Sequence, residues 1–274
     1  MQVIKTGIGP KTKFIISTSG RINSMKRYQR LLQKILNLDI TYLPISAYAD
    51  DGLIKPQDFA NVIKGLGAIG GAISKDIKAK IVPYLDQLDP LAQKVQSVNT
   101  VINRDGKLFG YNTDAYGFRE AIMTGIEKHN LTVETALVYG YGGVFNVVYH
   151  VLEGLGIRVF VTGRDPAQVE RVNQTYALES HDGKAKDLFI NATPVTDDPL
   201  DQAPGFLSAL AGSKLAFDHH MPGAEMVAYC HENNIAFIPG TDMYYPQMHS
   251  QWALFLEEFV DKKDLPELIQ KASQ

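Results

Sequence analysis

The amino-acid sequence predicts an α/β protein of two domains, and three observations support this prediction. The chain has 274 residues, which is more than the roughly 100 to 200 that one domain usually holds. Short runs rich in Ile, Val and Phe alternate with segments of helical periodicity, as in parallel sheets whose strands are joined by helices. This alternation occurs once, gives way to a helical stretch over residues 114–128, and then begins again.

The first block of alternating elements leads us to expect a mostly parallel sheet that is covered on both faces. Over residues 24–36, apolar side chains recur three and four positions apart, as on one face of a helix. The expected elements of this block are strands over residues 13–17, 40–45 and 69–74 and helices over 24–36 and 56–64.

The second block repeats the pattern, and the last helices, from about residue 245 to 274, are expected to pack back on the first block. One domain should therefore hold residues 1–113 with 240–274, and the other residues 114–239. Small-molecule sites usually form between domains. The expected elements of the second block are strands over 135–140, 158–163, 187–193, 214–219 and 236–240 and helices over 144–155 and 166–176.

Composition and charge exclude several classes of protein. The hydrophobic share of 45% is that of a globular protein, and the net charge of −3 argues against broad binding to nucleic acid or to an anionic membrane. No apolar run is long enough to span a bilayer, and the N-terminal residues lack the apolar core of a signal peptide. We therefore expect a soluble, cytoplasmic protein with a small-molecule ligand, as a monomer or homodimer.

Cysteine and histidine usage argues against a metal site and a disulfide framework. Cys230 is the single cysteine, and it falls in a helical stretch that favours a core residue over a nucleophile. The seven histidines form no His-Glu-x-x-His motif, so we expect no metal.

A glycine-rich turn joins the strand over 135–140 to the following helix. Its residues, Gly140, Gly142 and Gly143, would expose backbone N–H groups at a helix N-terminus, which favours a dinucleotide pyrophosphate. The same pattern also suits a tight turn that binds nothing. Arg164 lies 24 residues after Gly140, near the position where such folds recognise the ribose, and an arginine there suits the 2′-phosphate of NADP. Asp165 beside it keeps NAD as the less favoured cofactor.

Three polar motifs follow one another in the first block. They are GGAISKDIK over residues 70–78, QSVNT over 96–100 and GYNTDAYG over 110–117. Taken singly, Lys78 suits a solvated lysine, and Asp114 suits a helix cap. In this order, the motifs resemble those of the shikimate dehydrogenase family, and the resemblance extends over nearly the whole chain.

The resemblance implies an NADP-dependent oxidoreductase that interconverts a shikimate- or quinate-like alicyclic hydroxy acid and its ketone, as in aromatic amino acid biosynthesis. Lys78 matches the family's catalytic lysine, and Asp114 matches its partner carboxylate. An N-terminal substrate domain and an NAD(P)-binding Rossmann domain are implied. The remaining implied site residues are Ser24, Ser74, Asn99 and Gln247 for the substrate and Gly140, Gly142, Gly143, Arg164, Asn191, Thr193 and Gly240 for the cofactor.

The sequence also departs from the family pattern. Of the serine pair that usually holds the substrate carboxylate, Ser24 alone is found, with Met25 or Lys26 near the place of the second serine. Asp76 stands in place of a proline, and residues 219–221 lack an expected tyrosine. The chain therefore resembles a divergent branch, for which the substrate stays open. One of the basic side chains of the first helix could hold a carboxylate instead, namely Lys26, Arg27 or Arg30.

Oxidation of an alcohol by a nicotinamide requires that a proton leave the hydroxyl, and a lysine paired with a carboxylate can accept it. We therefore expect Lys78 and Asp114 to converge on the reacting hydroxyl, with Asn99 and Gln247 orienting the ring. The same pair of charges could also form an ordinary salt bridge. The sequence is compatible with two further functions. One is a dehydrogenase of the methylenetetrahydrofolate type, and the second is a catalytically lapsed binding or regulatory module, which the bulky Val144 and Phe145 would favour.

Overall fold

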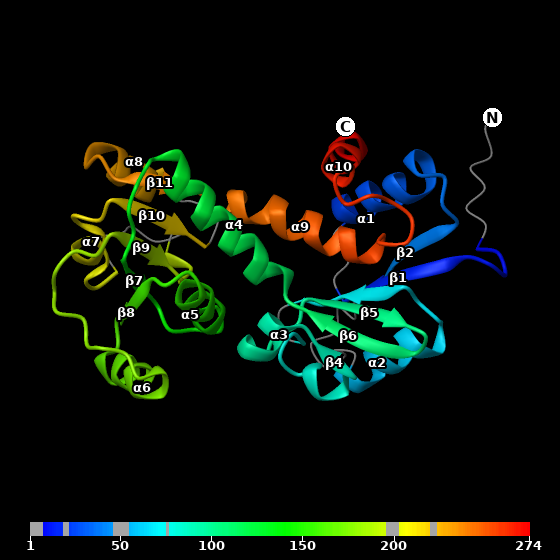
Figure 1. Ribbon diagram of the computed structural model, residues 1–274, viewed down its shortest axis with the longest axis horizontal. Helices are drawn as coiled ribbons and strands as arrows, with labels where there is room; N and C mark the ends of the chain where they lie inside the picture. The colour runs from blue at the N-terminus through cyan, green and yellow to red at the C-terminus, as the bar shows by residue number, and fades with distance from the viewer. Residues whose placement is uncertain (1–7, 19–21, 46–54, 75–76, 196–202, 220–223) are drawn as a thin grey trace. The chain divides into compact units, whose positions relative to one another are not determined.

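The computed structural model describes residues 8–18, 22–45, 55–74, 77–195, 203–219 and 224–274, and Asp76 lies outside this part. The chain forms two compact units. The first unit comprises Met1–Thr113 and Met248–Gln274, and the second unit comprises Asp114–Gln247. The predicted α/β class is confirmed, with one sheet in each unit (Figure 1). The binding roles expected of the two parts stay predictions.

The second unit is built on a five-stranded sheet in which every pair of neighbouring strands is parallel, with the order β11-β10-β9-β7-β8. The three central strands, β7, β9 and β10, are buried along nearly their whole length, which explains their continuous runs of apolar residues. The strands are β7 (Thr135–Tyr139), β8 (Arg158–Thr162), β9 (Leu188–Asn191), β10 (Leu215–Asp218) and β11 (Ala236–Ile238). The helices are α4 (Thr113–Lys128), α5 (Phe145–Gly154), α6 (Pro166–Tyr176), α7 (Phe206–Leu210) and α8 (Ala224–Glu232).

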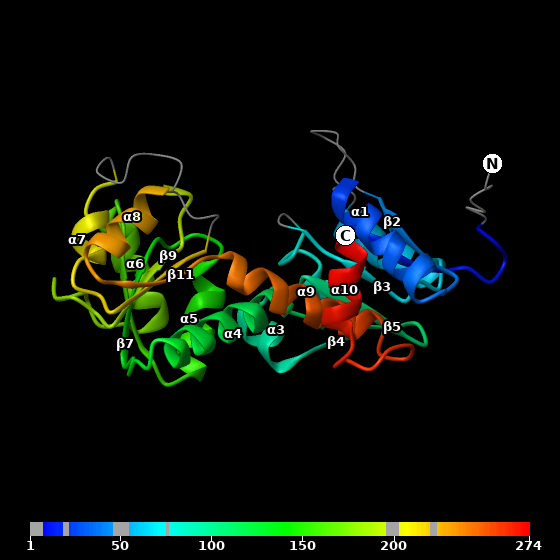
Figure 2. The same ribbon diagram turned by 90° about the horizontal axis from the view of Figure 1, so that it is seen from above.

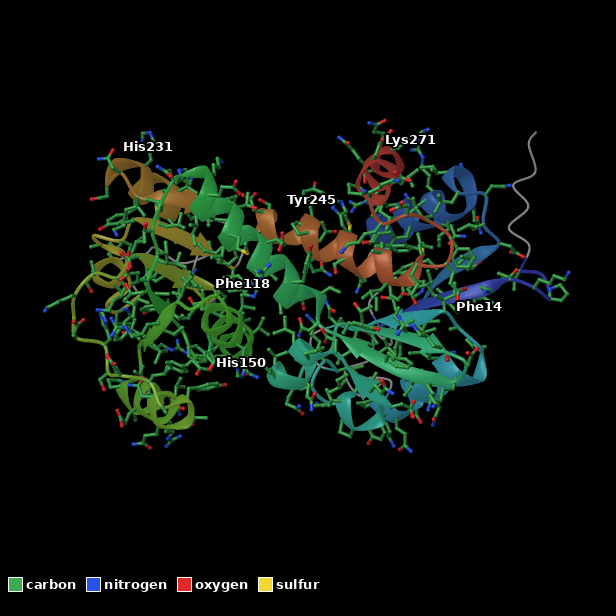
Figure 3. The ribbon with its side chains drawn as sticks, viewed as in Figure 1. Phe14, Phe118, His150, His231, Tyr245 and Lys271 are labelled. Carbon is green, nitrogen blue, oxygen red and sulfur yellow. The ribbon has the colours of Figure 1, made fainter. Side chains whose placement is uncertain are left out.

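Helices cover both faces of this sheet. Ala216 belongs to the cluster that packs against α7 and α8. The next residue, Phe217, meets Phe118 of α4 with 5.1 Å between the ring centres (Figure 3). Neighbouring residues of a strand point to opposite faces, so α4 lies on the face away from α7 and α8. Figure 2 shows α7 and α8 on one side of the strands and α4 on the other. Because the strands are parallel, their carboxyl ends lie at one edge of the sheet.

The first unit contains a six-stranded sheet of order β2-β1-β3-β5-β6-β4. Its strands are β1 (Lys13–Ser17), β2 (Ile40–Pro44), β3 (Gly70–Ala72), β4 (Gln87–Leu88), β5 (Thr100–Arg104) and β6 (Lys107–Tyr111). Its helices are α1 (Ile22–Gln29), α2 (Pro56–Gly65), α3 (Pro90–Val95) and α10 (Leu265–Ser273), with a π-helical turn over Arg30–Ile35 and a 3₁₀ turn over Val82–Tyr84. The long helix α9 (Thr241–Phe255) contains the boundary between the units.

The three strands expected in the first sheet are parallel, since β1 pairs in this way with both β2 and β3. The antiparallel strand of the sheet is not among the expected elements. Strand β5 runs antiparallel to both β3 and β6. The cause is the turn at Asp105 and Gly106, whose φ angles of 53° and 82° are those of a tight two-residue hairpin. A turn this short can join only antiparallel strands. The expected strand over 69–74 is also shorter, and the expected helix over 24–36 changes to a π-helical turn at Arg30.

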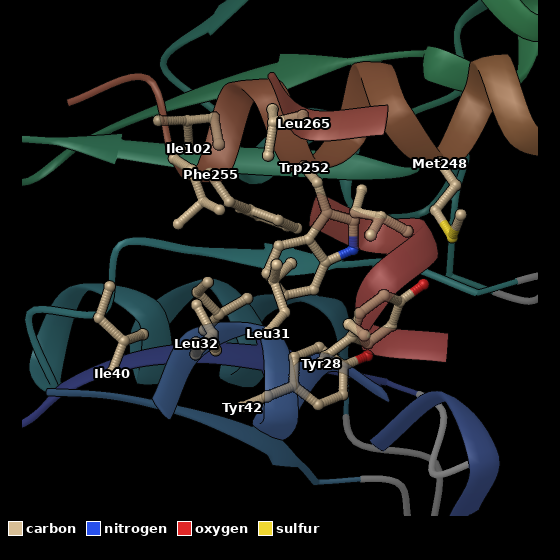
Figure 4. Packing of buried hydrophobic residues seen from close by; sticks show 14 residues of the cluster. Tyr28, Leu31, Leu32, Ile40, Tyr42, Ile102, Met248, Trp252, Phe255 and Leu265 are labelled. Atoms are coloured by element: carbon tan, nitrogen blue, oxygen red, sulfur yellow. The ribbon is translucent and has the colours of Figure 1, made fainter. Parts of the chain in front are cut away.

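The C-terminal helices pack on the first unit, as predicted. Trp252 of α9 is fully buried, and its ring centre lies 4.3 Å from that of Tyr28 and 6.0 Å from that of Tyr42. Leu265 and Ile269 of α10 complete the same apolar cluster. Figure 4 shows how these side chains interlock between α1, β2 and α9. This packing fixes the C-terminal half of α9 against the strands that carry the candidate substrate residues.

Candidate active site

Two hydroxyl groups meet where β1 and β3 end in the first unit. The backbone amide of Ser74 donates to Oγ1 of Thr18 over 2.7 Å, and that hydroxyl donates to Oγ of Ser74 over 2.9 Å. Ser74 is a predicted site residue, whereas Thr18 is not. The signal for Thr18 is its place directly after a predicted strand, because neighbouring parallel strands end at one edge of a sheet.

Asn99 is the centre of a hydrogen-bond network that is almost fully buried, with 2% of the residue exposed. Its Oδ1 accepts from the backbone amide of Thr113 and from Oγ1 of Thr100, both over 2.9 Å. Its Nδ2 donates to Oγ1 of Thr113 over 2.9 Å. The described part of the chain offers no acceptor for the second N–H of this amide. Asn99 therefore ties β5 to the start of α4 and keeps one donor for a ligand.

A residue that no sequence motif indicates completes this network. Gln251 of α9 donates from Nε2 to Oγ1 of Thr100 over 2.9 Å and to the carbonyl oxygen of Asn99 over 3.2 Å. Gln251 follows the predicted site residue Gln247 by four positions, so both lie on one face of α9. That helical spacing is the signal that could have identified it.

The two predicted catalytic residues lie in different parts of the chain, one in a turn and one in a helix. Lys78 is half-buried in a turn, and its carbonyl oxygen accepts a hydrogen bond of 2.9 Å from the amide of Val98. Asp114 is the second residue of α4, directly after Thr113. The convergence of the Lys78 amine and the Asp114 carboxylate stays a prediction.

Helix α1 carries Ser24 and the three basic residues that could hold a carboxylate. Ser24 is half-buried near the start of the helix, whereas Lys26 and Arg30 are exposed. Arg27 is half-buried, and its Nη1 lies 3.4 Å from Sδ of Met248 in α9. Of the three basic residues, Arg27 is the one that is half-buried beside α9.

The glycine turn of the second unit contains glycines of two kinds. Gly140 has a φ of +110°, and a Cβ there would lie 2.4 Å from Cγ2 of Thr193, so the fold itself requires glycine. Gly142 and Gly143 have ordinary φ angles, and a Cβ on either would meet nothing within 4 Å. Neither packing nor backbone conformation explains these two glycines, whereas the close approach of a ligand would.

A cavity of about 350 Å³ lies beside this turn, at the carboxyl ends of the strands. The bulky residues that follow the turn do not line it. Phe145 is buried, and its ring packs on Tyr176 with 5.2 Å between centres. The narrowing that the bulk of Val144 and Phe145 suggests is therefore not found. The lining residues are Tyr139, Gly140, Tyr141, Gly142, Gly163, Arg164, Ala192, Thr193, Pro194, Val195, Ala203 and Pro204.

Arg164 and Asp165, which follow β8, make different contacts. Asp165 caps α6, since its Oδ1 accepts from the amide of Ala167 over 2.9 Å. Arg164 is exposed and lines the cavity. The acidic group is thus engaged by the helix, and the cationic group is presented to a ligand. This arrangement suits a phosphorylated ribose better than a ribose hydroxyl.

Asn191 and Gly240, both predicted near the cofactor, hold the local backbone and do not line the cavity. Asn191 is fully buried, donates to Oδ1 of Asp218 over 3.1 Å, and accepts from the amide of Thr193 over 3.0 Å. Gly240 accepts from the amide of Met243 over 3.2 Å at the start of α9. Thr193, by contrast, lines the cavity directly.

Nucleophilic and metal chemistry receive no support from the described residues. Cys230 is fully buried, and burial raises the pKa of its thiol to about 12, with a further contribution from Asp218. An unreactive thiol of this kind fits the predicted core role. In the described ranges, no group of histidine, cysteine and acidic side chains could hold a metal. No helix among them has the length and apolar character needed to cross a bilayer.

Comparison with known proteins identifies relatives, although no protein-family model matches the chain. A shikimate dehydrogenase (NADP(+)) from Desulforamulus reducens is 31% identical over 189 residues, which cover 62% of this chain and 63% of the relative. One from Bacillus cereus is 35% identical over 120 residues, 43% of either chain. The chain thus matches less than two thirds of the length of these relatives.

Solved structures share the fold over almost the whole chain. A shikimate 5-dehydrogenase-like protein has a TM-score of 0.74 at 21% identity and covers 98% of this chain and 100% of its own. Shikimate 5-dehydrogenase from Thermus thermophilus, solved in complex with shikimate, has a TM-score of 0.70 at 22% identity, over 95% of this chain and 98% of its own.

Proposed function

Because this chain is a relative of the shikimate dehydrogenases, as its motifs predict, we propose that it is an NADP-dependent dehydrogenase. Its substrate is a shikimate- or quinate-like alicyclic hydroxy acid, which it interconverts with the ketone, as in aromatic amino acid biosynthesis. One observation carries the proposal. The carbonyl oxygen of Lys78 accepts from the amide of Val98, and the amide of Thr113 donates to the side chain of Asn99. The backbone of Lys78 and the residue before Asp114 are therefore both held by the segment Val98-Asn99.

In this mechanism, the amine of Lys78 accepts the proton of the reacting hydroxyl during oxidation and returns it during reduction. As a cation, it also stabilises negative charge on that oxygen in the transition state. The carboxylate of Asp114 orients the amine. The remaining N–H of Asn99 donates to a ring hydroxyl of the substrate, held in place by the buried bonds to Thr113 and Thr100.

The cavity residues suit a dinucleotide. Gly142 lines the cavity and leaves the backbone open to a pyrophosphate, Thr193 lines it beside Gly140, and Arg164 is placed for the ribose. A nicotinamide held in this cavity would supply the hydride chemistry of the reaction. The binding of NADP in preference to NAD follows from the engagement of Asp165 as a helix cap.

Replacement of the lysine tests the proposal. We expect Lys78→Ala to lower turnover of shikimate or quinate with NADP⁺ by about 10² to 10⁴-fold. Lys80→Ala, two positions along and exposed, is the matched control and should keep the wild-type rate. A Lys78→Ala variant with wild-type turnover would contradict the assigned role.

The same assay addresses the possibility of a lapsed module. Tight NADPH binding without turnover of shikimate, quinate and related cyclohexane acids would favour a binding or regulatory protein. The bulk of Val144 and Phe145 does not support that possibility, because Phe145 packs away from the cavity. The choice among substrates, the cytoplasmic location and the monomeric or homodimeric state stay predictions.

A further inference from the structure

The second residue of the glycine turn, Tyr141, places a large aromatic ring over the end of β8. A Cβ built on Gly163 would lie 2.7 Å from Cε1 and 3.2 Å from Cδ1 of this ring. Gly163 has no positive φ angle, so its backbone conformation is open to any residue. A side chain at position 163 would therefore displace the Tyr141 ring from its present place.

The ring of Tyr141 lines the 350 Å³ cavity together with Arg164. A second tyrosine, Tyr139, lines it too and donates its hydroxyl to the carbonyl oxygen of Pro204 over 2.9 Å. Burial raises the pKa of Tyr139, and charge on Tyr141 would raise it further, whereas Arg164 lowers it. Tyr141 and Arg164 thus line the same cavity, and the Tyr141 ring lies against the residue that directly precedes Arg164.

We propose that the Tyr141 hydroxyl and the Arg164 guanidinium form a two-donor subsite for the phosphate on the adenosine ribose of the dinucleotide, with Gly163 as its floor. This inference rests on the proposed function and adds a residue that selects the phosphorylated cofactor. Tyr141 is a binding and specificity residue in this scheme, and it takes no part in hydride or proton transfer.

The physical reason for two donors lies in the exposure of Arg164. A solvated guanidinium gains little from one ion pair, because water and salt screen the charge. A phosphate monoester has three strong acceptor oxygens and a charge of about −1.5 to −2. A tyrosine whose ring is held against Gly163 supplies a charge-assisted hydrogen bond at a low cost in conformational entropy.

The test compares dissociation constants of NADPH and NADH, measured by fluorescence titration without substrate. Tyr141→Phe keeps the ring and removes the hydroxyl, so we expect NADPH to bind roughly tenfold more weakly and NADH to change less than about twofold. The matched control is Tyr149→Phe on α5, whose hydroxyl donates to Glu153 outside the cavity. It should leave both constants unchanged.

A second set of variants tests the contact between the ring and the glycine. Gly163→Ala displaces the ring, so NADPH should again bind at least about tenfold more weakly. Adding Gly163→Ala to Tyr141→Ala should cause no further loss, because the ring is already absent. Thermal unfolding midpoints separate a binding defect from a folding defect, and Tyr141→Phe, which adds no atom, remains informative if Gly163→Ala is unstable.

Three outcomes would overturn the inference. In the first, Tyr141→Phe leaves NADPH affinity unchanged or weakens both nucleotides equally, so that the hydroxyl does not recognise the phosphate. In the second, the wild type binds NADH as tightly as NADPH and still oxidises substrate, which leaves the proposed dehydrogenase activity intact and removes its preference for NADP. In the third, the wild type binds neither nucleotide, and the proposed function fails as well.

Discussion

The Asn99 network of the first unit and the open glycines of the second unit form their sites in different ways. In the first unit, Asn99, Thr100 and Gln251 form one buried network. In the second unit, Gly142 and Gly143 meet nothing within 4 Å where a side chain would begin. The candidate site of the first unit is thus held by hydrogen bonds that the folded chain makes without a ligand. The glycine turn of the second unit instead provides space beside the backbone.

This difference predicts how substitutions act in each unit. A change inside the buried network breaks bonds of the folded state, so stability and activity should fall together. A change at an open glycine adds atoms where the protein itself has none, so ligand affinity should fall while stability is kept. Each of the following predictions tests one side of this contrast.

The largest effect is expected from two glycines of the same turn. Gly140→Ala forces a side chain into a positive φ and against Thr193, and we expect it to lower the free energy of unfolding by about 2 to 4 kcal/mol. Gly142→Ala should change that free energy by less than about 0.5 kcal/mol. Urea unfolding measures both values.

The same pair should behave differently toward the cofactor. Gly142→Ala, although stable, should weaken NADPH binding by about tenfold or more, because the pyrophosphate approaches the backbone at this position. If Gly142→Ala binds NADPH like the wild type, the open space at this glycine has no connection with the ligand.

Asn99 tests the first unit. Asn99→Ala leaves the buried amide of Thr113 and the hydroxyl of Thr100 without their acceptor, so we expect a loss of about 2 to 4 kcal/mol in unfolding free energy together with most of the activity. Asn103→Ala is the matched control, because it removes hydrogen bonds of the same sheet outside the site. It should lower stability and keep kcat.

How much the sequence can predict also differs between the units. The strands of the second unit are buried on both faces, so their apolar runs are continuous and indicate the strand bounds within one or two residues. In the first unit, the alternation of strands and helices does not predict the hairpin around Asp105 and Gly106. An Asp-Gly pair between apolar runs is nevertheless a strong hairpin signal. A prediction based on the alternation of strands and helices alone therefore misses the hairpin that the Asp-Gly pair indicates.

The site residues divide in the same way. Gly142, Gly143 and Asn99 belong to short motifs, and a motif is visible in the sequence. Thr18 and Gln251 act through contacts with residues 56 and 151 positions away, respectively. Contacts over such distances depend on strand order and helix packing, which no local pattern contains.

Substitution of Asp187 tests whether the second unit can become less stable while its affinity for NADPH stays the same. Burial opposes the charge of this carboxylate, but hydrogen bonds from Lys214, Glu134 and Thr135 lower its pKa to about 2. A pKa below that of the unfolded chain stabilises the fold above pH 4, and this contribution of about 2 kcal/mol is lost as the pH falls toward 2.

Asp187→Asn should therefore be less stable than the wild type at pH 7 and nearly equal to it near pH 2, as measured by urea unfolding. Because Asp187 directly precedes β9, it lies at the ends of the strands away from the cavity. NADPH affinity at pH 7 should be unchanged. A variant whose stability differs from that of the wild type by the same amount at both pH values would rule out this linkage.

The smallest expected effect concerns Arg27, which belongs to the first unit without belonging to its buried network. Methionine keeps the apolar stem of the arginine, so we expect Arg27→Met to change the free energy of unfolding by about 1 kcal/mol or less. If the guanidinium takes the place of the missing second serine, KM for a carboxylate substrate such as shikimate should rise by about tenfold, the effect of losing one charged hydrogen-bond donor.

The methyl ester of shikimate has no carboxylate, so its KM should be the same for the wild type and for Arg27→Met. Lys26→Met, on the exposed side of the same helix, should change neither KM. Equal increases for acid and ester would mean that Arg27 shapes the site without recognising charge. The first unit would then hold its ligand through hydroxyl and amide groups alone, and the contrast between the units would rest on geometry and not on charge.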